Sequence, residues 1–77
     1  MPTRAYIAGE EDGEIFFTDG IPRGDATEAL VNALTKEELA RFLGLSLRAV
    51  QTQGRAWDRA LAEYQAGVDS VYDANEE

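Results

Sequence analysis

Residues 47–72 read LRAVQTQGRAWDRALAEYQAGVDSVY and carry the clearest periodic pattern of the chain. Apolar residues, interrupted by one glycine, alternate at spacings of three and four positions: Leu47, Val50, Gly54, Trp57, Leu61, Tyr64, Val68 and Val71. This is the a/d pattern of a heptad seam, so it predicts a long amphipathic helix. A continuous helix over 47–72 would be about 39 Å long, whereas a domain of this size is only about 30 Å across. We therefore expect the overhanging seam to pack against a second copy in a homodimer.

The two glycines in this stretch leave an alternative open. Glycine costs about 1 kcal/mol inside a helix, so Gly54 or Gly67 could divide the segment into two shorter helices. These helices would fold back over the rest of the chain, and the seam would then be ordinary core.

The first third of the chain predicts a β-hairpin. Residues 4–8 (RAYIA) and 14–18 (EIFFT) are rich in aromatic and β-branched residues, as strands are. The intervening GEEDG, residues 9–13, supplies the glycines and the Asp-Gly step of a tight connection. Asp19-Gly20 and Pro22 end the second predicted strand.

Paired capping signals follow the predicted hairpin. Asp25 and Glu28 have the spacing of a capping box, which opens a helix through about Leu34. Thr35 and Glu38 repeat the device and open a second helix.

The second helix is expected to end at Gly44, and Ser46 is expected to cap the third. Together these signals predict one α+β domain over residues 1–77. It would consist of a β-hairpin region (1–24) followed by three helices (25–77), of which the last is long and amphipathic.

Composition argues against catalysis. The 77 residues include no histidine and no cysteine, so the commonest general base, the strongest nucleophile and thiolate metal ligands are all missing. We therefore predict that the protein is not an enzyme and has no cofactor and no metal site. No apolar run has the length of a membrane span and no signal peptide is recognisable, so we expect a cytoplasmic location.

Charge is unevenly distributed along the chain, whose net charge is −8. Residues 1–28 hold seven acids and two bases, residues 36–59 hold five bases and three acids, and residues 60–77 hold five acids and no base. Two acidic ends thus flank a mildly basic middle.

The basic middle resembles a helix-turn-helix unit. Residues 35–62, which begin TKEELARFLGLSLRAV, are similar to the DNA-binding region of sigma factors and related bacterial regulators. The matching positions are Glu38, Leu39, Ala40, Leu43, Gly44, Leu45, Ser46 and Val50. In that family the small residue lets the helices cross, the glycine makes the turn, and the leucine and valine fill the core.

This resemblance implies that residues 46–59 form a recognition helix. Its polar stripe would contact phosphates and base edges: Arg48, Thr52, Arg55 and Arg59. The chain departs from the family at Ala49, where the usual threonine would offer a phosphate contact. A small transcriptional regulator that binds DNA through residues 35–59 is therefore one hypothesis, although a net negative charge opposes DNA binding.

A second resemblance concerns the type of protein. A short, cysteine-free, strongly acidic chain with a hairpin followed by helices is similar to small phage-encoded anti-defence proteins, including anti-CRISPR inhibitors. Many of these present carboxylates to a cationic groove that normally holds nucleic acid. The carboxylates that could mimic phosphates lie in the predicted hairpin and the last helix: Glu10, Glu11, Asp12, Glu14, Glu63, Asp69 and Asp73.

The leading hypothesis is therefore a non-catalytic inhibitor, acting as a DNA mimic in the host cell cytoplasm. Its partner would be a protein with a basic nucleic-acid-binding groove, such as a CRISPR effector complex. A toxin–antitoxin or adaptor partner fits the same charge pattern, and solubility alone also explains exposed acids.

Overall fold

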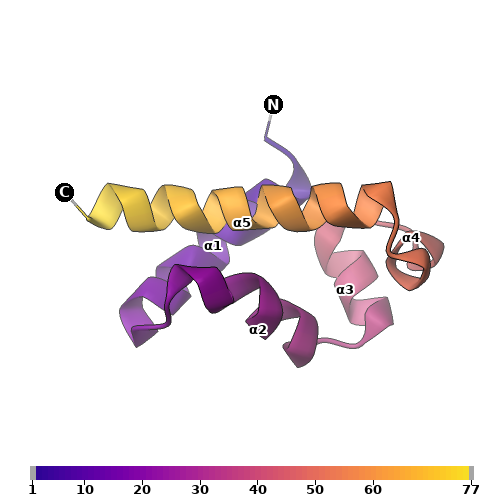
Figure 1. Ribbon diagram of the computed structural model, residues 1–77, viewed down its shortest axis with the longest axis horizontal. Helices are drawn as coiled ribbons and strands as arrows, with labels where there is room; N and C mark the ends of the chain where they lie inside the picture. The colour runs from indigo at the N-terminus through magenta and orange to yellow at the C-terminus, as the bar shows by residue number, and fades with distance from the viewer. Residues whose placement is uncertain (1, 77) are drawn as a thin grey trace.

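The computed structural model describes residues 2–76, and this part of the chain is helical throughout, with no strand (Figure 1). Its elements are α1 (Arg4–Asp19), a short 3-10 helix η1 (Arg23–Asp25), α2 (Ala26–Ala33), α3 (Lys36–Leu43), α4 (Leu47–Thr52) and α5 (Arg55–Asn75). The predicted α+β fold is therefore wrong. The error lies in the first third of the chain, where one helix stands in place of the hairpin.

Helix α1 spans both predicted strands and the connection between them. The Thr3 hydroxyl accepts a hydrogen bond from the Tyr6 amide and caps the start, and Gly20 ends the helix in the left-handed conformation at φ 76°. Gly9 and Gly13, which suggested a turn, lie inside the helix on its buried side. These glycines do not form a turn; they allow α5 to pack closely against α1.

Helices α1 and α5 cross at very short range. A Cβ atom added to Gly9 would lie 2.1 Å from the Tyr64 carbonyl oxygen, and one added to Gly67 would lie 2.2 Å from that of Tyr6. Such contacts are sterically impossible, so only glycine permits this approach of the two backbones. Ala5 and Ala8 are also buried in this region. Small residues thus make α1 and α5 one tightly packed layer.

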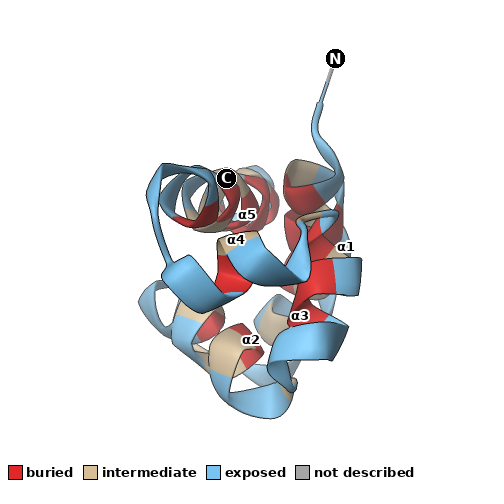
Figure 2. Ribbon diagram, turned by 90° about the vertical axis from the view of Figure 1, so that its right-hand side faces the viewer, coloured by how far each residue is buried: buried red, intermediate tan, exposed pale blue. Residues whose placement is uncertain are grey.

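The remaining helices cover one side of this layer. In Figure 2, α2, α3 and α4 lie together on the same side of α1 and α5. Leu30 of α2, Leu39 and Leu43 of α3 and Val50 of α4 are buried between the layers, with Tyr64 at the centre. Within residues 2–76, no helix combines the length and the apolar character needed to cross a bilayer.

The predicted continuous helix over 47–72 is also wrong, because the chain breaks between α4 and α5. Gln53 adopts the left-handed conformation at φ 50°, and Gly54 is extended. The break lets α4 fold back, so that Val50, only 1% exposed, reaches the core. The alternative in which the glycine at position 54 divides the segment is the one observed.

The capping predictions for α3 and α4 are confirmed. Thr35 and Glu38 form a complete capping box, and Gly44 ends α3 at φ 71°. The Ser46 hydroxyl accepts from the Ala49 amide and starts α4. Asp25 does stand at the start of α2, but its side chain makes no capping hydrogen bond, so the capping box predicted there is not formed.

Candidate functional site: the outer face of α1 and the α3–α4 unit

The four predicted acids of the first third lie on helix α1, on two different sides. Glu11 and Glu14 are exposed and Glu10 is half-buried, and none of the three forms an ion pair within the described residues. Asp12 points the other way and accepts a hydrogen bond of 2.6 Å from the Tyr64 hydroxyl. Burial, together with this hydrogen bond, raises the pKa of Tyr64 well above its usual range. Asp12 therefore stabilises the fold and is not free for a partner.

The three predicted acids of α5 have polar partners within the chain. Glu63 accepts from Arg59 at 3.1 Å, and Asp69 accepts from Gln65 at 2.9 Å. Asp73 pairs with Arg23 at 2.5 Å, which ties η1 to the end of α5. These carboxylates are less available than those of α1.

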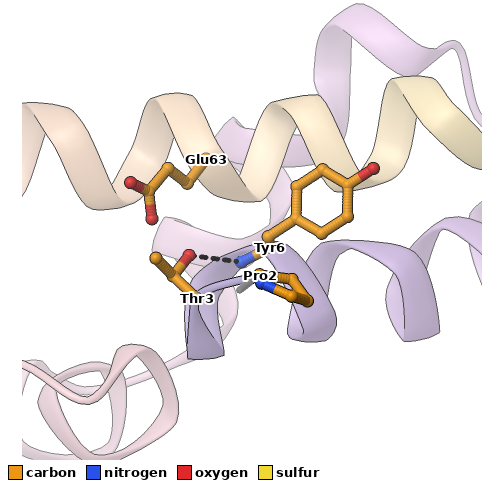
Figure 3. Close-up of a pocket in the computed structure, with 4 residues that line it drawn as sticks. All are labelled: Pro2, Thr3, Tyr6 and Glu63. Atoms are coloured by element: carbon orange, nitrogen blue, oxygen red, sulfur yellow. Dashed lines mark hydrogen bonds between the residues drawn. The ribbon is translucent and has the colours of Figure 1, made fainter.

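The pKa of Glu63 is lowered by the Thr3 hydroxyl first and by Arg59 second. Thr3 and Glu63 line a shallow cavity of about 230 Å³ at the start of α1, together with Pro2 and Tyr6 (Figure 3). The close-up draws a hydrogen bond from the Tyr6 amide to the Thr3 hydroxyl. The polar side-chain groups that line the cavity are two hydroxyls and one carboxylate. Across residues 2–76, no cluster of three or more metal-binding side chains is found.

The exposed side of α1 combines acids with apolar residues. Helical periodicity places Ile7, Glu11, Glu14 and Ile15 on the side away from Gly9, with the half-buried Glu10 at its edge, and we call these five residues the outer face of α1. Ile7 is 44% exposed and Ile15 is 58% exposed, which is high for isoleucine. After Arg4, helix α1 contains no base. The two isoleucines were missed as site residues because a hairpin was expected, although the spacing of 7, 11, 14 and 15 is helical.

A groove between α1 and α3 continues from the outer face. It has a volume of about 240 Å³ and is lined by Arg4, Ile7, Ala8, Glu11 and Phe42. Arg4, one of the lining residues, donates a hydrogen bond of 3.2 Å to the Phe42 carbonyl. Ile7 and Glu11 thus belong both to the outer face and to the rim of a groove with an aromatic wall.

The α3–α4 unit has the two helices and the short turn of a helix-turn-helix, but the predicted recognition helix is divided. Arg48 and Thr52 lie on the six-residue α4, whereas Arg55 and Arg59 lie on α5, beyond the break. The four residues therefore do not form one helical stripe. Arg59 pairs with Glu63, while Arg48 and Arg55 are exposed and form no ion pair with the residues that the structure describes.

The predicted dimer seam lies mostly in the core of the single chain. Five of its residues are buried: Val50, Trp57, Tyr64, Val68 and Val71. Leu61 is half-buried, and Leu47 is 39% exposed. In this conformation α1 takes the place that a second copy of the helix was expected to fill.

Comparisons of the chain with protein-family models, with curated proteins and with solved structures found no match. The outer face of α1 offers exposed isoleucines and carboxylates that form no ion pair among residues 2–76, and the bend between α4 and α5 has an exposed arginine on either side, Arg48 and Arg55.

Proposed function

We propose that the protein is a non-catalytic inhibitor that binds the nucleic-acid-binding surface of another protein, such as a CRISPR effector complex. The outer face of α1 is the contact surface. The observation that supports this proposal is a set of three carboxylates, Glu10, Glu11 and Glu14, that form no ion pair with any residue from 2 to 76 and lie beside two exposed isoleucines.

Both kinds of residue serve the same interaction. Carboxylates one helical turn apart can replace phosphates in a channel lined by Lys and Arg, and long-range attraction speeds the encounter. Ile7 and Ile15 then bury apolar area, which stabilises the complex by about 25 cal/mol per Å². DNA would be repelled by the carboxylates and would gain little from the isoleucines, so this face suits a protein partner.

The position of the helix also favours binding. Helix α1 is held against α5 by the glycine contacts and by the hydrogen bond from Tyr64 to Asp12. A surface that is already rigid loses little conformational entropy on association.

The test is competition for a nucleic acid. Purified CRISPR effector complexes of several types are incubated with fluorescently labelled target DNA, and the protein is titrated in while anisotropy is recorded. We expect displacement from at least one complex, weakening as salt is raised. The variant with Glu10→Lys, Glu11→Lys and Glu14→Lys should lose at least about tenfold in apparent affinity, which corresponds to about 1.4 kcal/mol.

The matched control reverses three exposed acids elsewhere, Glu28→Lys, Glu37→Lys and Asp58→Lys. It changes the net charge by the same amount and should retain most of the inhibition. If both variants lose it equally, only net charge matters and the assignment to α1 is wrong. If no effector is affected, the inhibitor proposal itself fails.

A regulator that binds DNA is the second candidate, favoured by Arg48 and Arg55, which are exposed and form no ion pair within the described part of the chain. The measurement is anisotropy of a mixed-sequence duplex at low salt, where even a sequence-specific protein binds non-specifically. Salt-sensitive binding that is lost in Arg48→Ala/Arg55→Ala and strengthened by the α1 reversal would favour this candidate. Absence of binding at high protein concentration would exclude it.

A further inference from the structure

The connection between α4 and α5 is held in an unfavourable backbone conformation. Among the described residues, Gln53 is the one non-glycine residue with positive φ, at 50°. Every residue from 51 to 56 is exposed, and a Cβ atom at Gly54 would meet nothing within 4 Å. Residues 51–56 themselves therefore make no packing contact that requires the bend, which is compensated only by the burial of Val50 on α4, and the left-handed residue disfavours it.

The sequence on both sides of the bend keeps the register of a single helix. Leu47, Val50, Gly54 and Trp57 follow the a/d spacing without a phase shift. If Gln53 and Gly54 became helical, α4 and α5 would form one helix over residues 47–75, about 44 Å long. Such a helix would carry α5 away from α1.

We propose that two copies of the chain exchange α5 by straightening at Gln53 and Gly54. In the exchanged dimer, α5 of each copy packs against α1 of the other. All contacts between α5 and the rest of the fold are then made again between copies, and only the hinge changes its conformation. Short, strained hinge loops favour such exchange.

A second copy is the occupant because the surface left by α5 is specific to α5. A side chain at position 67 would collide with the Tyr6 carbonyl, and one at position 9 would collide with the Tyr64 carbonyl. The surface of α1 therefore accepts only a helix that has a glycine at the crossing. The hydroxyl of Tyr64 must also reach Asp12, and Asp73 must reach Arg23. An unrelated helix would leave these polar groups without partners. This inference is independent of the partner proposed for the outer face of α1.

The first experiment measures oligomeric state by light scattering after size exclusion, for the full chain refolded at high concentration so that exchange can occur. Alanine at position 54 fits the bent form, and it favours a helical hinge over glycine by about 1 kcal/mol. The exchanged dimer has two hinges, so Gly54→Ala should tighten dimer association by roughly 30-fold. Gln53→Gly relieves the left-handed residue and should shift the chain toward monomer. If Gly54→Ala stays monomeric at the highest soluble concentration, the proposal is overturned.

The second experiment distinguishes exchange from ordinary association. The chain has no cysteine, so Gly13→Cys with Val71→Cys introduces one defined pair. A Cβ at position 13 would lie 3.1 Å from the Val71 Cβ and 3.2 Å from the Val68 Cα, so the helices must separate by a few tenths of an ångström, which brings the two Cβ atoms into the disulfide range. The tested chain carries this cysteine pair together with Gly54→Ala. In the exchanged dimer the two cysteines that meet belong to different copies, so the oxidised dimer should run as a covalent dimer on non-reducing gels. A dimer fraction that yields only monomeric, internally linked chains would overturn the exchange.

Discussion

The molecule contains two pairs of packed helices, α1 with α5 and α3 with α4, and the two pairs are stabilised differently. The α3–α4 unit is defined by local hydrogen bonds: a capping box at Thr35, a left-handed glycine at position 44 and the Ser46 cap. The α1–α5 pair depends on contacts between residues more than fifty positions apart, such as Gly9 with Tyr64 and Asp12 with Tyr64. Local contacts can be recognised in a sequence window, whereas distant contacts appear only when the chain has folded.

This difference has an energetic consequence. A capping hydrogen bond contributes about 1 kcal/mol and fixes where a helix begins. A close helix crossing positions two whole helices, because the backbones of α1 and α5 meet directly at Gly9 and Gly67. Substitutions in the α1–α5 crossing should therefore have larger effects on stability than those in the α3–α4 unit.

The largest effect is expected at the crossing. In Gly67→Ala the new methyl group would lie 2.2 Å from the Tyr6 carbonyl oxygen and 2.9 Å from the Glu10 amide nitrogen. Backbone atoms cannot rotate away, so the free energy of unfolding should fall by about 3 kcal/mol, at the upper end for overpacked cores. The better helix propensity of alanine offsets only about 1 kcal/mol. Urea unfolding followed by circular dichroism measures the change.

The matched control is Gly24→Ala, where a Cβ meets nothing within 4 Å. Its free energy of unfolding should stay within about 0.5 kcal/mol of the parent. If the two alanine variants are equally stable, α1 and α5 do not cross at Gly67.

An intermediate effect is expected at the polar contact beside the crossing. Tyr64→Phe removes the hydroxyl that donates to Asp12, and loss of a hydrogen bond to a charged group should cost about 2 kcal/mol. The raised pKa of Tyr64 means that the folded state holds the neutral phenol. The neutral Tyr64 hydroxyl therefore stabilises the fold fully below pH 10, the ordinary pKa of tyrosine, and this stabilisation is lost as the pH rises above that value.

Thermal unfolding between pH 8 and 11 checks this prediction. The parent should lose stability above about pH 10, the usual range of tyrosine, more steeply than the Phe variant does. Identical alkaline profiles would show that the Tyr64 hydroxyl is not protected by the fold.

The smallest effect is expected in the α3–α4 unit. Thr35→Ala removes one half of the capping box and should lower the free energy of unfolding by about 1 kcal/mol. The hydrogen bond from the Thr35 amide lowers the pKa of Glu38, and the Thr35 hydroxyl adds to this. The ionised Glu38 carboxylate therefore stabilises the folded state above pH 4.5, the ordinary pKa of glutamate, and this stabilisation is lost as the pH falls below that value.

Glu38→Gln should therefore weaken the acid dependence of the melting temperature, while Glu37→Gln, an exposed neighbour with no capping bond, serves as the control. An acid profile altered equally by both glutamines would contradict the role of the capping box.

The candidate site could be predicted from the sequence only in part. Glu10, Glu11 and Glu14 are indeed exposed or half-exposed, but their grouping with Ile7 and Ile15 follows from a helix that was expected to be a hairpin. Asp12 was expected beside them and is turned inward, because successive residues of a helix point in different directions. The stripe of Arg48, Thr52, Arg55 and Arg59 required an unbroken helix, and the bend at Gln53 divides it.

The sequence by itself determined the α3–α4 unit, because the Thr35 capping box, the glycine at position 44 and the Ser46 cap act within four or five residues. It also determined the uneven distribution of charge along the chain. Only the tertiary structure decided what Gly9, Gly13 and Gly67 are for and where the apolar seam is buried. A glycine fits a turn, a break and a close crossing equally well, and the choice depends on the backbone that lies opposite it.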